Sequence, residues 1–143
     1  MANIPINEQR DDMNLSVEHI GLPARNPRVL ADWYAAAFGA EFITPDGQEP
    51  PFFLRPRRSA VMFEIYAATG HNAVTEDNEL AGWRHLALRV DSIESARKEL
   101  ESRGVKFIEP VKPAAGGGRI QFFKDCEGNL LHLVERPADS VFA

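Results

Sequence analysis

Four side chains that can hold a metal ion recur at a regular distance along the sequence. They are His19, Glu64, His85 and His132. Neutral imidazole and carboxylate groups are suitable ligands for Zn²⁺, Fe²⁺, Ni²⁺ or Mn²⁺. His85 follows His19 by 66 residues, and His132 follows Glu64 by 68 residues. The sequence therefore offers one imidazole and one further donor in each of two halves.

Each of these donors falls in a predicted β-strand whose other face is apolar. Residues i and i+2 of a strand share a face. Phe63 and Ile65 lie on one face of the strand predicted at 60–67, and Glu64 lies on the other with Met62 and Tyr66. The same alternation places His85 opposite Leu86 and Leu88, and it places His132 opposite Leu131 and Leu133. An isolated histidine in a strand is usually an ordinary, partly buried residue, so the matched positions in two halves carry the prediction of a site.

Two arginines and a phenylalanine are predicted on the same face as the donors. Alternation assigns Arg89 to this face in its strand, and it assigns Arg119 and Phe123 to this face in theirs. A guanidinium group can anchor a carboxylate or a phosphate by forked hydrogen bonds. We therefore expect Arg89, Arg119 and Phe123 to contact a bound small molecule, together with Met62 and Tyr66.

The elements that must position these residues also repeat. Asn26 and Pro27 predict the start of a helix that ends at Gly39, and Asp91 with Glu94 predicts a second helix start. That second helix is predicted to end at Gly104, 65 residues after Gly39. Strands are predicted at 15–22, 41–44, 52–55, 60–67, 84–90, 105–109, 119–124 and 129–135. The order β-α-β-β-β thus occurs twice, which indicates an internal duplication and an α+β fold.

The predicted organisation is one domain made of two modules. Residues 1–14 form a polar extension, module one spans 15–67, a polar linker spans 68–82, and module two spans 83–137. Residues 138–143 form a C-terminal tail. The length of 143 residues is that of one ordinary domain.

Composition excludes several classes of function. The chain has 16 basic and 21 acidic residues, a net charge of −5, which disfavours binding to nucleic acid. No apolar run approaches the roughly 18 residues needed to cross a membrane. The single cysteine, Cys126, excludes an internal disulfide and a multi-cysteine zinc site. We expect a cytoplasmic protein that binds a small molecule.

Several motifs resemble those of the vicinal oxygen chelate superfamily. They are Val17-Glu-His-Ile-Gly-Leu22, Met62-Phe-Glu-Ile65, Arg84-His-Leu-Ala-Leu88 and Phe122-Phe-Lys-Asp-Cys-Glu-Gly-Asn-Leu-Leu-His132. The superfamily includes glyoxalase I, methylmalonyl-CoA epimerase, extradiol dioxygenases, fosfomycin-resistance enzymes and bleomycin-binding proteins. The resemblance covers about residues 15–137. It implies paired βαβββ modules whose curved sheets surround a metal-centred cavity. Single-chain members of this length are usually homodimers, and in many of them each site takes ligands from both chains.

The resemblance also implies a ligand set with one departure. The metal ligands of the family fall on His19, Glu64 and His85, and the fourth falls on position 132. The family usually has glutamate at this fourth position, where it serves as a base or completes a two-His-one-carboxylate triad. This chain has His132 instead, so that Glu64 is the only carboxylate in the predicted ligand set.

The function that we expect is that of a metal-dependent enzyme of the lyase or isomerase type. A small substrate would present two neighbouring oxygens to a divalent ion (Zn, Ni, Fe or Mn), with Glu64 as fourth ligand or as general base. One alternative is a metal-free binding protein of the bleomycin-resistance type. Another is an extradiol dioxygenase, which would have its carboxylate on the wrong strand.

Overall fold

The computed structural model describes residues 15–70 and 77–142. Two helices and eight short strands follow one another in an order that repeats. The elements are β1 (His19–Ala24), α1 (Pro27–Phe38), β2 (Glu41–Phe42), β3 (Phe52–Arg55), β4 (Met62–Ala67), β5 (His85–Arg89), α2 (Ile93–Ser102), β6 (Lys112–Pro113), β7 (Arg119–Lys124) and β8 (Leu130–Glu135). The predicted α+β fold with two tandem βαβββ modules is confirmed. The predicted extension at 1–14 and part of the predicted linker lie outside the described residues.

Each module forms its own four-stranded sheet, and the two sheets have the same topology. The strand orders are β1-β4-β3-β2 and β5-β8-β7-β6. In each sheet the first strand pairs in parallel with the last strand of its module, and the remaining pairs are antiparallel. As a result, β1 and β5 are edge strands with a neighbour on one side only.

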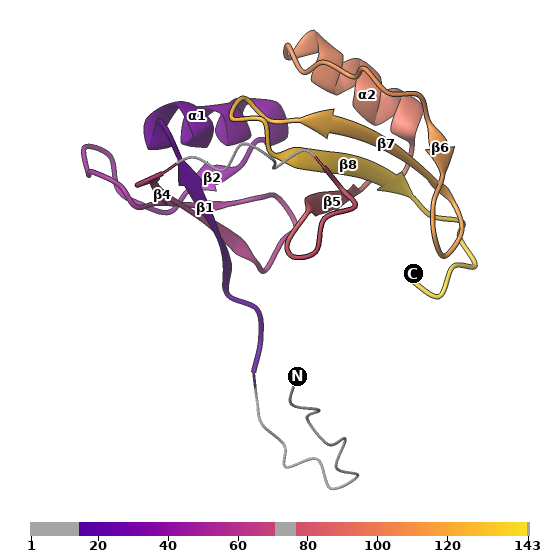
Figure 1. Cartoon of the computed structure of the whole chain (residues 1–143), viewed down its shortest axis with the longest axis horizontal. Helices are drawn as coiled ribbons and strands as arrows, with labels where there is room; N and C mark the ends of the chain where they lie inside the picture. The colour runs from indigo at the N-terminus through magenta and orange to yellow at the C-terminus, as the bar shows by residue number, and fades with distance from the viewer. Residues whose placement is uncertain (1–14, 71–76, 143) are drawn as a thin grey trace, which may run out of the picture.

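The two helices cover the same side of the sheets, as Figure 1 shows, and one hydrophobic core lies between the helices and the sheets. The second module packs partly on the first helix. The ring of Phe38 on α1 lies 6.2 Å from that of Phe123 on β7. The hydroxyl of Tyr34 on α1 donates a buried hydrogen bond of 2.9 Å to Asp125, in the turn between β7 and β8. The sheet faces that do not touch helices therefore point away from the shared core.

The helix ends follow local sequence signals, with one correction. The Asn26 side chain accepts from the amide of Val29, and Gly39 ends α1 in the left-handed conformation at φ 63°. The second helix was expected to start at Asp91, but its N-cap is Ser92, whose hydroxyl accepts from the Ser95 amide.

Two predicted strands have different bounds in the structure. The first strand begins at His19 rather than at residue 15. Residues 105–109 form no strand, and the outer strand β6 is only two residues long. The main-chain oxygen of Glu109 accepts a 2.9 Å hydrogen bond from the side chain of Gln121 in place of a ladder bond. Val105 and Phe107 face the core in alternation with the exposed Lys106 and Ile108, so the segment has the burial pattern of a strand without the strand pairing.

Among the described residues, no helix is long and apolar enough to cross a membrane.

Candidate functional site

Half-site one consists of His19, Glu64 and Phe53, from three neighbouring strands of the first sheet. His19 is in register with Met62, so Glu64 lies two residues further along β4 on the same face. The Nε2 atom of His19 is 3.4 Å from Oε2 of Glu64. Phe53 is opposite Glu64 in the register, and its ring meets the His19 ring edge-on at 5.9 Å between centres. We call the face of each sheet that carries these side chains the ligand face.

The hydrogen bonds of His19 decide which of its nitrogens is free to bind. Its Nδ1 atom lies 3.0 Å from a carboxylate oxygen of Glu18. A carboxylate only accepts, so Nδ1 carries a proton, and the other nitrogen, Nε2, faces Glu64. Either a proton on Nε2 or a metal ion can lie between this nitrogen and the carboxylate. Their separation of 3.4 Å exceeds the 2.7–2.9 Å of a charge-assisted hydrogen bond, and it is close to the roughly 3.3 Å between two donors on one tetrahedral ion.

Half-site two consists of His85, His132 and Phe122 on the second sheet. His85 is in register with Leu130, so His132 lies two residues further along β8, as Glu64 does on β4. The two imidazole rings are 4.6 Å apart between centres. Phe122 is opposite His132 in the register, and its ring lies 5.7 Å from that of His85. The two half-sites therefore repeat the same arrangement, with imidazole in place of carboxylate at one position.

Hydrogen bonding and burial also restrict the imidazole nitrogens of half-site two. Nδ1 of His85 lies 2.6 Å from the side-chain oxygen of Asn78, which leaves its Nε2 atom as the ligand atom. His132 is only 8% exposed, and its Nδ1 atom is buried with no hydrogen-bond partner in the described part of the chain. Burial lowers the pKa of His132 to about 4, helped by the positive charges of His85, Arg136 and Lys112. His132 is therefore neutral at pH 7, the state in which imidazole binds metals.

The two half-sites do not come together within one chain. Over residues 15–70 and 77–142, no group of three or more His, Cys, Asp or Glu side chains could hold a metal ion. The donor sets fit a metal as two halves, each too small to hold an ion alone. One hollow of about 370 Å³ is lined by Trp33 on α1, the segment 104–109 and β7, including Phe122 of half-site two, and a second of about 410 Å³ lies between the start of α1 and the loop at 47–50.

Three predicted substrate contacts lie on the ligand face. Met62 and Tyr66 share the face of Glu64 on β4. The Tyr66 ring packs on the backbone of Gly21, where a Cβ would lie 3.3 Å from the ring. Arg89 shares the face of His85 on β5, and it donates to the main-chain oxygen of Phe142.

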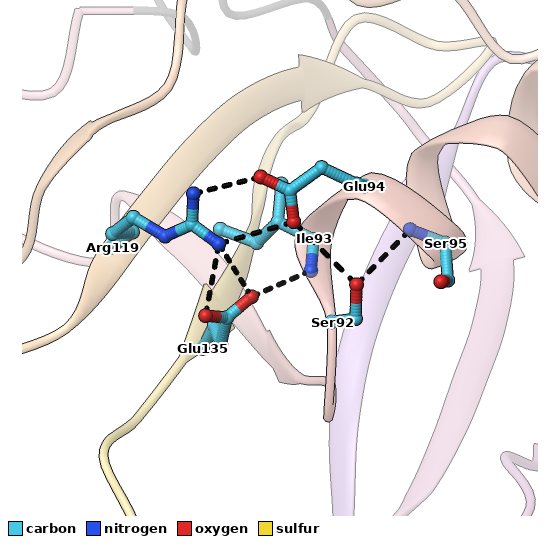
Figure 2. A network of polar contacts seen from close by, with 6 residues as sticks. All are labelled: Ser92, Ile93, Glu94, Ser95, Arg119 and Glu135. Carbon is cyan, nitrogen blue, oxygen red and sulfur yellow. Dashed lines mark hydrogen bonds and ion pairs between the residues drawn. The ribbon is translucent and has the colours of Figure 1, made fainter.

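The predictions for Arg119 and Phe123 are wrong about the face. Arg119 is in register with Glu135 on the helix side of the second sheet. Figure 2 shows its guanidinium bonded to Glu135 and to Glu94, the latter on α2. The backbone amide of Ile93 also donates to Glu135, at 2.8 Å. This amide and Arg119 lower the pKa of Glu135, and Arg119 lowers that of Glu94. Arg119 therefore ties the start of α2 to the sheet.

Phe123 lies in the hydrophobic core. It is 2% exposed and contacts Phe38 and Phe107, with the Phe107 ring centre at 4.8 Å. Alternation along β7 was predicted correctly, but the two faces were exchanged. Counting across the turn at 125–129 pairs Phe122 with His132, and this count would have assigned the faces from sequence.

Four further residues at the half-sites were not predicted from the sequence. Glu18 and Asn78 fix the histidines, and Phe53 and Phe122 pack against them. Glu18 lies before the first residue of β1, where strand alternation does not apply. Asn78 lies in the aperiodic segment that was read only as a linker.

Comparisons with known proteins agree with this architecture. The family model described as Glyoxalase/Bleomycin resistance protein/Dioxygenase superfamily matches residues 16–133. The glyoxalase family protein from Enterococcus faecalis is 25% identical, with a TM-score of 0.67, over 84% of this chain and 97% of that one. No curated protein matches the sequence.

Two further solved structures share the fold. The antibiotic binding protein TnmS3 from Streptomyces sp. is 20% identical, with a TM-score of 0.63, over 87% of this chain and 98% of that one. A variant of the fosfomycin resistance protein FosX from Listeria monocytogenes, complexed with Mn(II) and 1S,2S-dihydroxypropylphosphonic acid, is 19% identical. Its TM-score is 0.63, over 89% of this chain and 94% of that one. At these identities the likeness concerns the fold.

Proposed function

The chain belongs to the Glyoxalase/Bleomycin resistance protein/Dioxygenase superfamily, and on this premise we propose that it is a metal-dependent enzyme of the lyase or isomerase type. Its substrate is a small molecule with two neighbouring oxygens. The metal is a divalent ion, Zn, Ni, Fe or Mn. When bound, the ion supplies Lewis acidity that stabilises negative charge developing on a substrate oxygen.

One observation carries this proposal. Nε2 of His19 and an oxygen of Glu64 face each other at 3.4 Å, with the second nitrogen of the histidine held by Glu18. Half-site two repeats the arrangement with His85, held by Asn78. Outer groups of this kind, which fix the tautomer and orientation of a histidine, are typical of metal ligands.

We propose that a homodimer completes the site, with half-site one of one chain meeting half-site two of its partner. The edge strands β1 and β5 are free on one side and carry the two first-strand histidines. Apolar side chains flank both edges in exposed positions, with Val17 64% and Trp83 98% exposed. Free strand edges beside exposed apolar groups favour pairing with another chain.

Within the assembled site Glu64 is the proposed general base. It is the only carboxylate among the four donors, since His132 occupies the matching position of the second module. A carboxylate that leaves the ion can accept a proton from a carbon next to the substrate carbonyl and return it to a neighbouring position. The three imidazoles, fixed by Glu18, Asn78 and packing, hold the geometry during this transfer.

The metal content of His85→Ala tests this proposal. Protein purified without chelator and analysed for metals should contain a divalent ion, and His85→Ala should lose it because one of the two imidazoles of half-site two is gone. Arg97→Ala on the exposed side of α2 is the control and should keep the metal. Full metal occupancy in His85→Ala would overturn the assignment of the site.

A metal-free binding protein is the second candidate, and His132 is the observation that favours it. An imidazole in place of a carboxylate lowers the negative charge available to hold a cation. Met62 and Tyr66 would then contact the ligand, and the histidines would only line the site. A wild-type protein that contains no metal, and takes up none on dialysis against Zn²⁺ or Mn²⁺, would select this candidate over the enzyme.

A further inference from the structure

The ligand face of the second sheet is positively charged in an otherwise acidic chain. Register places ten strand residues on this face: His85, Ala87, Arg89, Lys112, Ile120, Phe122, Lys124, Leu130, His132 and Val134. Three of the ten are cationic and none is a carboxylate, although the chain as a whole has a net charge of −5. The acidic residue of β8, Glu135, lies on the opposite face with Arg119.

The matching face of the first sheet has a different charge. It carries the carboxylates Glu41 and Glu64 and one cation, Arg55. The difference between the two faces is therefore specific to the second module, and it is not a general property of the repeated fold.

Arg89 is the cation whose contacts suggest a ligand. Its guanidinium donates to the main-chain oxygen of Phe142, which belongs to the C-terminal segment and not to the sheet. The Phe142 ring lies 4.4 Å from the Arg136 guanidinium and covers Gly116. A Cβ on Gly116 would come within 2.5 Å of this ring, so the position of the ring over residue 116 requires glycine there.

An aromatic ring lies on the same face as this cation. The Phe122 ring is only 6% exposed, and Lys112 Nζ lies 4.6 Å from its centre. Lys112 is also within 3.4 Å of Glu109, but both side chains are about half exposed, and such pairs are weak. The row of positive charge therefore borders a largely buried aromatic ring.

We infer that the small molecule bound on this face is an anion, with a carboxylate or phosphate-type group anchored by Arg89. The Phe142 carbonyl accepts the hydrogen bond of the guanidinium until the anion replaces it. This deepens the proposed function by naming the charge class of its substrate. A guanidinium binds a carboxylate or phosphate through two parallel N–H···O bonds and with opposite charge, whereas a main-chain carbonyl offers one neutral oxygen, so the exchange favours the anion. It rests on the proposed function only in taking the ligand face as the binding face, and it requires no metal.

Paired probes of equal shape test the charge requirement. Mandelate carries two neighbouring oxygens, an aromatic ring and a negative charge, whereas mandelamide lacks the charge. Isothermal titration calorimetry of the full chain in the presence of chelator, where no metal can bind the probes, should show mandelate binding at least about tenfold more tightly than mandelamide. Arg89→Gln should abolish this difference, while Arg97→Gln, which removes an exposed guanidinium on α2, should preserve it. Inorganic phosphate should compete with mandelate.

Shortening the chain tests the role of Phe142. A variant that ends at Ala138 leaves Arg89 without the carbonyl, so mandelate should bind several-fold more tightly than to the full chain. Weaker binding would show that the tail builds the site, and would overturn the exchange.

The outcomes separate this inference from the proposed enzyme. Equal binding of the two probes, no binding of mandelate or phosphate, or an unchanged preference in Arg89→Gln each overturns the anion site, even if the protein holds a metal. An Arg89-dependent preference for mandelate in a protein that never binds metal would support the anion site and reject the enzyme.

Discussion

His132 occupies the position that Glu64 has in the first module, and this one difference shapes the chemistry of the proposed site. Both residues lie two positions beyond the register partner of the first-strand histidine, and both face a phenylalanine across the sheet. Three imidazoles and one carboxylate form a more nitrogen-rich and less negative donor set than two of each. Such a set suits Zn²⁺ or Ni²⁺ better than a hard ion such as Mg²⁺. It also leaves one carboxylate to move protons.

The burial of His132 predicts a specific dependence of stability on pH. Its pKa is lowered to about 4 in the folded chain, mainly by burial, against about 6.5 in the unfolded chain. Between these values the unfolded state binds more protons, so the free energy of unfolding falls as pH falls from 6.5 to 4. With allowance for solvent screening, the loss is about 1–2 kcal/mol.

Urea unfolding of the metal-free protein across this pH range checks the effect. His132→Gln should show a shallower dependence than the wild type, because glutamine does not titrate. Parallel pH curves for the two proteins would contradict the buried, neutral state of His132.

At the scale of elements, local signals predicted more than long-range ones. The Asn26 cap, the Gly39 stop and the twofold β-α-β-β-β order depend on neighbouring residues, and the sequence showed them. The faces of β7 depend on its pairing with β8, and both faces are apolar enough to be buried, so Phe123 and Arg119 were assigned to the wrong one. Residues 105–109 alternate between core and surface as a strand does, but a strand also requires pairing with a neighbour, which the local pattern does not show.

The contact between α1 and the β7–β8 turn gives the prediction at this scale. Tyr34 donates to Asp125, whose carboxylate also accepts from the amides of Glu127 and Asn129. Burial, together with the Asp125 charge, raises the pKa of Tyr34 well above its usual value, so the hydroxyl remains a donor. Tyr34→Phe leaves a buried carboxylate with one donor fewer and should lower the free energy of unfolding by about 1–3 kcal/mol.

Chemical denaturation measures this loss. Tyr66→Phe is the matched control, because Tyr66 is 38% exposed on the ligand face, and it should change stability little. Equal stability of Tyr34→Phe and wild type would show that the hydroxyl does not join the modules.

At the scale of the molecule, the shared core explains why the site is divided. Both helices and the helix sides of both sheets pack into one cluster, so the two ligand faces point outward. The sequence shows the types and offsets of the four proposed donors. It could not show that the donors of one chain remain in two pairs, because that depends on how the modules pack.

In the proposed homodimer, half-site one of one chain meets half-site two of another. Mixing His19→Ala with His85→Ala tests it directly. In a mixed dimer both lesions fall in one site, and the other site takes wild-type His19 and Glu64 from one chain and wild-type His85 and His132 from its partner.

Metal analysis of the isolated mixed dimer is the deciding measurement. Each variant alone should contain no metal, whereas the mixed dimer, isolated with two different affinity tags, should contain one ion per dimer. A mixed dimer as empty as the two parent variants would contradict the shared site, because a site formed within each chain would carry a lesion in both chains.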